Sequence, residues 1–446
     1  MIFERIESEG LAHYSYIVGN RNKAVVIDPR RDAQVYLDIA NEAGMKITHV
    51  LETHRNEDYL IGSREIGAQT NAKILHSDYE NYDFEYGSTI RDQDIINFGD
   101  LQIKAIHTPG HTLGHMSYLL YDDEDNPWII FTGDTLFAGD VGRTDFYEGQ
   151  KEEMTEKLYN SIFNKILPLG DGVIICPAHG AGSVCGSNIT ERIWTTIGLE
   201  KKHNPALQFD DKQLFIGAHA KDLDYPPYFK QMEKYNRIGP FVEKSLPDCP
   251  PLSPTEFKKI AEKAQIVDIR SETCFAGAHI PNSISLKENI IPNFAGWFLN
   301  YEDPILLLGG SEKIDTVVRF LFRQGFDNVA GYLKGGVTAY SKAGYKTGSI
   351  TTINPSDAKN KINADKETFI LEIGAGNSSI PSDLQMELPS VPDKLDQFPA
   401  DKNIYVLCPS GIRSMSAASI LKKNGLDNIS VIRGGLSGWS KISELN

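Results

Sequence analysis

Short apolar runs separated by turn residues recur along the chain. Before residue 245 they are Ala24–Ile27, Gln102–Ile106, Trp128–Thr132 and Val173–Cys176. Runs of this length between Gly, Pro, Asn and Asp predict buried strands. Two further runs, Ile305–Leu308 and Ile404–Leu407, each precede a loop and a helix-like segment. Strand, loop, helix and strand in this order predict α/β domains in which helices cover a parallel sheet.

Two stretches interrupt this pattern. Residues 245–254 contain four prolines, which interrupt helices and central strands. Residues 347–366 are rich in Thr, Asn, Lys and Asp and have little apolar periodicity, which suits a surface connection. At roughly 150 residues per domain, we expect three domains, at 1–244, 253–346 and 363–446.

The two C-terminal blocks repeat one another. The sequence GFDNV at 325–329 recurs as GLDNI at 425–429, and KGGV at 334–337 recurs as RGGL at 433–436. The repeat predicts one fold used twice, so any difference in function must come from the loops.

Composition excludes several classes of protein. The formal net charge is −15, which argues against sequence-independent binding to nucleic acid. No run approaches the ~20 apolar residues of a membrane helix, and the N-terminus does not read as a secretory signal. Five cysteines are too few for a disulfide scaffold. We therefore expect a cytoplasmic protein with reduced thiols and no membrane or nucleic-acid partner.

Candidate metal ligands follow the predicted strands. Four loops each carry a His or Asp beside Gly, Pro or Thr: His54, which shares its loop with Asp58, His111, Asp134 and His179. Strand ends are where α/β scaffolds commonly build a site. Imidazole and carboxylate together favour zinc or iron over calcium or magnesium.

A candidate nucleophile follows the run that ends at Leu407. Cys408 begins a short loop that leads through Gly411 and Arg413 into a helix-like segment. Backbone N–H groups at a helix N-terminus, together with a nearby arginine, stabilise a thiolate and can hold a bound persulfide.

The N-terminal block resembles the metallo-β-lactamase superfamily, most closely glyoxalase II and the persulfide dioxygenases. The motifs that carry the resemblance are PGHT at 109–112, TGD at 132–134, GRTD at 142–145 and PAH at 177–179. The resemblance implies an αββα sandwich.

The first metal motif departs from the superfamily pattern T-H-x-H-x-D-H. Asn56 replaces its second His and Tyr59 replaces its last, so only His54 and Asp58 remain. The last His serves the second metal of the hydrolases, so Tyr59 disfavours a binuclear hydrolase.

The persulfide dioxygenases hold one Fe(II) on two His and one Asp. The resemblance implies His111 and Asp134 as ligands, with His54 supplying the nitrogen that Asn56 lacks. We expect one Fe(II) per chain, with zinc or a lost metal as alternatives. Asp58 and His179, with Asn56 and Tyr59, are expected beside the metal, orienting ligands or substrate.

The C-terminal blocks resemble rhodanese (sulfurtransferase) domains. Cys408, Gly411 and Arg413 match the active-site pattern C-x-x-G-x-R, and RGGLSGW at 433–439 is typical of the family. This implies catalytic roles for Cys408 and Arg413. In the first block the equivalent of Cys408 falls on Leu308 or Gly309, so this block lacks the nucleophile. The resemblance therefore implies a structural or docking role for the first block.

Together the resemblances imply a persulfide dioxygenase–sulfurtransferase of sulfide metabolism. Its substrates would be a low-molecular-weight thiol persulfide, such as glutathione or coenzyme A persulfide, with thiosulfate or sulfite. The alternatives are a sulfurtransferase with a metal-poor N-terminal binding domain, and a thioester hydrolase of the glyoxalase II kind. Similar fusions commonly self-associate, so we expect a homo-oligomer.

Overall fold

The computed structural model describes residues 1–80, 82–186, 188–209, 211–240, 245–364, 367–374, 380 and 382–443. The chain forms two compact units, residues 1–246 with 322–325 and residues 247–321 with 326–446. Residues 244 and 446, where two of the expected domains end, lie outside the described residues. The expected domain boundaries remain a proposal.

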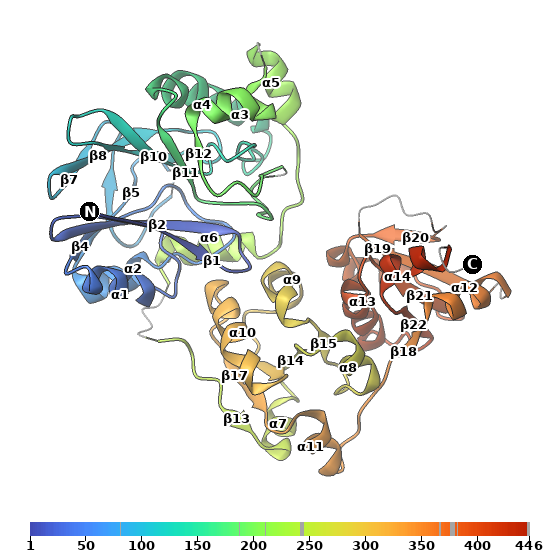
Figure 1. The fold of residues 1–446 in the computed structure, drawn as a ribbon. Coiled ribbons are helices and arrows are strands. Elements are labelled where there is room, and N and C mark those ends of the chain that lie inside the picture. The colour runs from blue at the N-terminus through green and yellow to red at the C-terminus, as the bar shows by residue number, and fades with distance from the viewer. Residues whose placement is uncertain are drawn as a thin grey trace. The chain divides into compact units, whose positions relative to one another are not determined.

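The first unit contains two six-stranded sheets (Figure 1). The strands of the first sheet, in spatial order, are β1 (Ile2–Ser8), β2 (His13–Asn20), β3 (Lys23–Ile27), β4 (Lys46–Leu51), β5 (Lys73–Ser77) and β6 (Ser88–Ile90). The strands of the second sheet are β12 (Thr195–Thr196), β11 (Ile174–Pro177), β10 (Pro127–Gly133), β9 (Met116–Tyr121), β8 (Leu101–His107) and β7 (Ile95–Phe98). Three of the four predicted runs before residue 245 lie within these strands, and the fourth, Val173–Cys176, begins one residue before β11.

Helices cover the outer face of each sheet. They are α1 (Gln34–Glu42) and α2 (Ser63–Thr70) on the first sheet, and α3 (Lys151–Ser161), α4 (Ile197–His203) and α5 (Lys212–His219) on the second. On β10, Ile129 and Phe131 pack between the sheets, whereas Ile130 packs with the helices. Burial on both faces explains why the run reads as continuously apolar. The expected αββα sandwich is confirmed.

The second unit contains two parallel five-stranded sheets of the same spatial order. The first consists of β13 (Pro251–Leu252), β17 (Val329–Leu333), β16 (Ile305–Leu308), β14 (Gln265–Asp268) and β15 (Ile284–Ser285). The second consists of β18 (Thr351–Ile353), β22 (Ile429–Ile432), β21 (Asn403–Leu407), β19 (Thr368–Ile373) and β20 (Leu384–Met386). The repeat in the sequence is therefore a repeat of topology, and the two expected parallel α/β folds are confirmed.

The helices of the second unit follow the same repeat. They are α7 (Pro254–Ile260), α8 (Glu272–Gly277), α9 (Ile291–Phe298), α10 (Ser311–Arg323), α11 (Gly336–Lys342), α12 (Pro355–Ala364), α13 (Ile412–Lys423) and α14 (Gly435–Ser440). The sheets share one hydrophobic core, to which Val267, Leu307, Val406 and Leu421 contribute. Among the described helices none is long and apolar enough to cross a membrane.

The prediction of a surface connection at residues 347–366 is wrong, because this stretch contains β18 and α12. Strand β18 pairs with β22 at the edge of the second sheet, before residue 363, where we placed the third domain. Ala358 is the one buried residue of α12, so the helix has no apolar stripe for the sequence to reveal. Of the prolines at 245–254, Pro251 begins the edge strand β13 and Pro254 begins the capped helix α7, positions that are compatible with the restricted backbone of proline.

Candidate functional site

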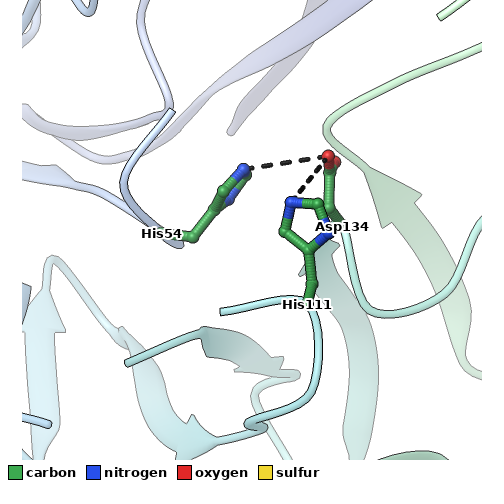
Figure 2. A group of neighbouring side chains, drawn as sticks. All are labelled: His54, His111 and Asp134. Atoms are coloured by element: carbon green, nitrogen blue, oxygen red, sulfur yellow. Dashed lines mark ion pairs between the residues drawn. The ribbon is translucent and has the colours of Figure 1, made fainter. Parts of the chain in front are cut away.

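The candidate metal ligands lie in loops that follow strands of both sheets in the first unit. His54 follows β4, His111 lies between β8 and β9, Asp134 follows β10 and His179 follows β11. The structure brings His54, His111 and Asp134 into one buried group, with one candidate ligand atom of each within 4.8 Å of the others. Figure 2 shows the two imidazoles pointing toward the carboxylate.

The two imidazoles present the same nitrogen to Asp134. The Nε2 atom of His54 lies 3.8 Å from Asp134 Oδ2, and the Nε2 atom of His111 lies 3.5 Å from it. Two atoms bound to one first-row metal ion at its usual bond lengths lie about 3 to 4 Å apart. The spacing therefore fits a single ion between the three side chains.

The other ring nitrogens are anchored. His111 Nδ1 lies 2.9 Å from the carbonyl oxygen of Arg143, to which it donates. His54 Nδ1 lies 2.8 Å from Thr53 Oγ1, and that hydroxyl donates to Asp28 Oδ2 at 2.8 Å. The hydroxyl therefore accepts from Nδ1–H of His54, which leaves Nε2 unprotonated. Neither Nε2 has a hydrogen-bond partner among the described residues, as expected for nitrogens that bind a metal ion.

Burial also sets the protonation states. It lowers the pKa of His54 to about 3, against the attraction of Asp134, and it lowers the pKa of His111. Burial opposes ionisation of Asp134, but His179 and His54 outweigh it and hold the pKa of Asp134 below its ordinary value. Neutral imidazoles and an ionised carboxylate are the forms that bind metal.

Gly142 allows the loop after β10 to pass directly against the backbone of Asp134. A Cβ atom at Gly142 would lie 1.9 Å from the carbonyl oxygen of Asp134. The GRTD motif thus allows the chain to pass against the backbone of a candidate ligand.

His179 bridges two carboxylates beside the group. Its Nδ1 atom lies 2.8 Å from Asp134 Oδ1, and its Nε2 atom lies 3.0 Å from Asp58 Oδ2. Burial opposes the charged ring, but Asp134 and Asp58 outweigh it and raise the pKa of His179 well above its ordinary value. Cys185 completes a second buried group with Asp58 and His179.

The two departures from the superfamily motif have different surroundings. The Asn56 amide nitrogen lies 3.4 Å from the carbonyl oxygen of His54, to which it donates. The Tyr59 ring is buried with its centroid 3.8 Å from that of His13 and 6.3 Å from that of His179. Burial raises the pKa of Tyr59 well above its ordinary value, so the phenol stays neutral and is a poor metal ligand.

Sequence reasoning missed Glu57, which occupies a variable position of the motif. Its Oε2 atom lies 3.8 Å from His111 Nε2, and its Oε1 atom lies 3.2 Å from Arg55 Nε. Burial raises the pKa of Glu57 well above its ordinary value, although Arg55 opposes the shift. The signal available in the sequence was a second acidic residue, directly before Asp58, inside the first metal motif.

A cavity of about 930 Å³ is lined in part by Phe146, whose ring centroid lies 5.0 Å from that of His111. Arg55, Phe146, Tyr147, Tyr225 and Lys230 contribute to its wall. Arg55, another residue of the wall, also pairs with Glu57 through its guanidinium.

Cys408 directly follows β21, at the N-terminus of α13. The backbone N–H of Gly411 donates to its Sγ atom at 3.1 Å, and that of Ser414 at 3.4 Å. Arg413 lies in the same turn, with Nη1 3.5 Å from Glu387 Oε2. Two N–H donors aimed at one sulfur suit a thiolate.

The RGG motif packs against this loop. A Cβ atom at Gly435 would lie 1.8 Å from the carbonyl oxygen of Cys408, so the close approach requires glycine. In the first repeat, Gly309 follows β16 as Cys408 follows β21. A Cβ atom at Gly309 would lie 2.4 Å from Cγ1 of Ile269, so a cysteine there would displace that side chain.

Comparisons with known proteins agree with the description of both the N-terminal unit and the C-terminal repeat. The model of the metallo-β-lactamase superfamily matches residues 9–179, and that of the rhodanese-like domain matches residues 253–343 and 369–442. The chain is 32% identical over 190 residues to the persulfide dioxygenase ETHE1 of Bos taurus, covering 40% of this chain and 68% of that protein. It is 28% identical over 213 residues to the hydroxyacylglutathione hydrolase GloC of Haemophilus influenzae, covering 43% and 91%.

A solved structure extends the likeness beyond the N-terminal unit. A metallo-β-lactamase from Staphylococcus aureus subsp. aureus COL has a TM-score of 0.67 and 31% identity, covering 75% of this chain and 98% of that one. Its span exceeds that of the lactamase model, so the likeness includes part of the rhodanese repeat. With both family models, a relative above 30% identity and the observed folds in agreement, the chain belongs to the metallo-β-lactamase superfamily and continues into a tandem of rhodanese-like domains.

Proposed function

We propose that this protein is a persulfide dioxygenase–sulfurtransferase with two separate centres. The observation that carries the proposal is the buried group of His54, His111 and Asp134, whose two unpartnered Nε2 atoms face one carboxylate. Two imidazoles and one carboxylate are the ligand set of non-haem iron oxygenases, which leave positions open for O₂ and substrate. The likeness to persulfide dioxygenases supports the same assignment.

The overall reaction of the first centre balances without any other oxidant. A thiol persulfide, O₂ and water yield the thiol, sulfite and two protons, so the outer sulfur is oxidised and O₂ is reduced. One bound Fe(II) supplies the activation of O₂ in this class of enzyme. His54, His111 and Asp134 hold it, while His179 fixes the orientation of Asp134 through its 2.8 Å hydrogen bond.

The cavity beside Arg55 receives the carrier part of the persulfide. Its volume of about 930 Å³ is ample for a tripeptide thiol, and aromatic walls from Phe146, Tyr147 and Tyr225 offer contact to its apolar atoms. Lys230 in its wall supplies a cation for a carboxylate of the carrier. Glutathione persulfide and coenzyme A persulfide are the two carriers to be compared.

The second centre transfers sulfane sulfur through Cys408. Its thiolate attacks the outer sulfur of thiosulfate, and the electron pair of the broken S–S bond leaves with sulfite. Gly411 and Ser414 N–H groups hold the resulting Cys408 persulfide, and the Arg413 guanidinium balances the charge of the anionic substrate. A thiolate or sulfite then takes the outer sulfur and releases the Cys408 thiolate.

A thioester hydrolase is the weaker candidate, although hydroxyacylglutathione hydrolases are among the relatives. Such hydrolases use a second metal, and here Tyr59 replaces one of its ligands. His179 spans the Asp58 and Asp134 carboxylates and supplies positive charge between them.

The test is to load the protein with Fe(II) and measure O₂ uptake on glutathione and coenzyme A persulfides, with hydrolysis of an acylglutathione thioester measured in parallel. The proposal predicts O₂ uptake and sulfite with at least one persulfide, and no thioester cleavage above that of buffer. Thioester cleavage without O₂ uptake would contradict it.

A further inference from the structure

Glu57 places a buried carboxylate beside the candidate metal group. The residue is 1% exposed, and neither carboxylate oxygen receives a hydrogen bond from any residue that the structure describes. A buried carboxylate is unfavourable unless a cation or hydrogen-bond donors compensate it. Arg55 Nε lies 3.2 Å from Oε1, and Oε2 lies 3.8 Å from His111 Nε2.

The loop that carries Glu57 is fixed from helix α6 (Phe229–Ile238). The Nδ2 group of Asn236, on this helix, donates to the carbonyl oxygens of Asn56 at 2.8 Å and Tyr59 at 2.9 Å. Its Oδ1 atom accepts from the N–H of Ile61 at 3.0 Å. Since Asn236 holds the backbone on both sides of Glu57, the direction of the Glu57 side chain is built into the fold.

One oxygen of Glu57 lies beside His111, a member of the metal group. Glu57 Oε2 lies 3.8 Å from His111 Nε2, close to the 3.5 Å and 3.8 Å that separate Asp134 Oδ2 from the two imidazole nitrogens. We propose that Glu57 is a fourth protein ligand of the divalent ion held by His54, His111 and Asp134. It takes the place of the imidazole that Asn56 does not supply.

This assignment has consequences for charge and for metal preference. Two carboxylates neutralise a divalent ion, so the buried centre carries no net charge once it is filled. Two nitrogen and two oxygen ligands suit iron or zinc. Arg55 keeps Glu80 at 3.8 Å and Glu233 at 3.5 Å as partners when Glu57 turns to the ion.

The assignment rests on the metal centre of the proposed function, and Co(II) binding tests it without any turnover. Glu57→Gln keeps the size of the side chain and removes its charge. Glu80→Gln is the matched control, because Glu80 is also a buried partner of Arg55 but its oxygens already accept hydrogen bonds from the Gly114 N–H and the Tyr147 hydroxyl. We expect Glu57→Gln to lower Co(II) affinity by at least about tenfold and to change the visible absorption of bound Co(II). Glu80→Gln leaves both near those of wild type.

Thermal unfolding separates a ligand from a mere counter-ion of Arg55. If Glu57 is a ligand, the apo Glu57→Gln protein unfolds no earlier than apo wild type, and the rise in Tm on adding Co(II) shrinks. If Glu57 serves only Arg55, the apo variant loses stability and its gain from Co(II) is unchanged.

A variant that does not fold gives the outcome expected of a structural counter-ion and overturns the assignment. Glu57→Asp retains the charge but withdraws the oxygens by one methylene group. It is expected to keep the fold and to alter the Co(II) spectrum. Equal affinity and spectra in wild type, Glu57→Gln and Glu57→Asp would also overturn it. If wild type itself binds no Co(II), the metal centre of the proposed function fails together with this assignment.

Discussion

His179 and Asp134 are joined by a 2.8 Å hydrogen bond that fixes the carboxylate between the two candidate ligand histidines. Asp134 Oδ2 faces His54 and His111, while Oδ1 lies nearest to His179. His179 Nδ1 also lies 3.0 Å from Oδ2, so the imidazole holds both oxygens while Oδ2 faces the candidate ligand histidines.

This geometry makes His179 a positioning residue. Because loss of such a partner typically costs about ten- to a hundredfold in metal affinity, we expect His179→Gln to weaken Fe(II) or Co(II) binding by that factor. Competition with a chromophoric chelator measures the affinity. His49→Ala, at a partly exposed histidine of β4, is the control and is expected to bind as wild type does. Unchanged affinity in His179→Gln would show that Asp134 needs no such support.

The metal content of the protein tests the interpretation that Tyr59 removes a ligand of the second metal site. We expect at most one iron or zinc ion per chain, because a neutral buried phenol replaces one ligand of a second site and His179 spans two of its other groups. Elemental analysis of the purified protein gives the ratio. Two tightly held ions per chain would contradict this account and favour a hydrolase.

Restoring the second histidine of the superfamily motif tests whether Asn56 weakens metal binding. Asn56→His replaces a weak neutral donor with imidazole, the ligand that Fe(II) prefers of the two. We expect higher Fe(II) affinity and occupancy than in wild type, with Asn56→Gln as the control for side-chain size. Lower occupancy in Asn56→His would mean that the position does not face the metal.

Cys408→Ser tests the second centre. Serine is nearly the same size but a far weaker nucleophile at neutral pH, so transfer of sulfur from thiosulfate to cyanide should be abolished. Circular dichroism is expected to match that of wild type, since the Gly411 N–H has an oxygen acceptor in place of sulfur. Transfer that survives at a similar rate would assign the activity to another residue.

Much of this architecture was predictable because its signals are local. The apolar runs at Ile129–Phe131 and Ile305–Leu308 are buried on both faces, so each strand appears in the sequence without knowledge of its neighbours. The loop at Cys408 is equally local, because the nucleophile and its N–H donors lie within seven consecutive residues. The same holds for the repeat of the rhodanese-like fold.

What the sequence did not reveal depends on long-range contacts. Glu57 lies at a variable motif position, and its orientation depends on Asn236, which is 180 residues from Asn56 along the chain. Helix α12 buries little besides Ala358, so its amphipathic pattern is too weak to separate it from a loop. In both cases the deciding interaction is absent from the local pattern.

The most direct test of the two-centre account compares Asp134→Ala with Cys408→Ser. Both variants are loaded with Fe(II), and each is assayed for persulfide-dependent O₂ uptake and for thiosulfate sulfur transfer. Asp134 supplies the anionic ligand of the first centre and Cys408 the nucleophile of the second. Asp134→Ala is therefore predicted to lose metal and O₂ uptake and keep sulfur transfer, and Cys408→Ser to show the reverse. Absence of O₂ uptake in Fe(II)-loaded wild type, or its persistence in Asp134→Ala, would contradict the account.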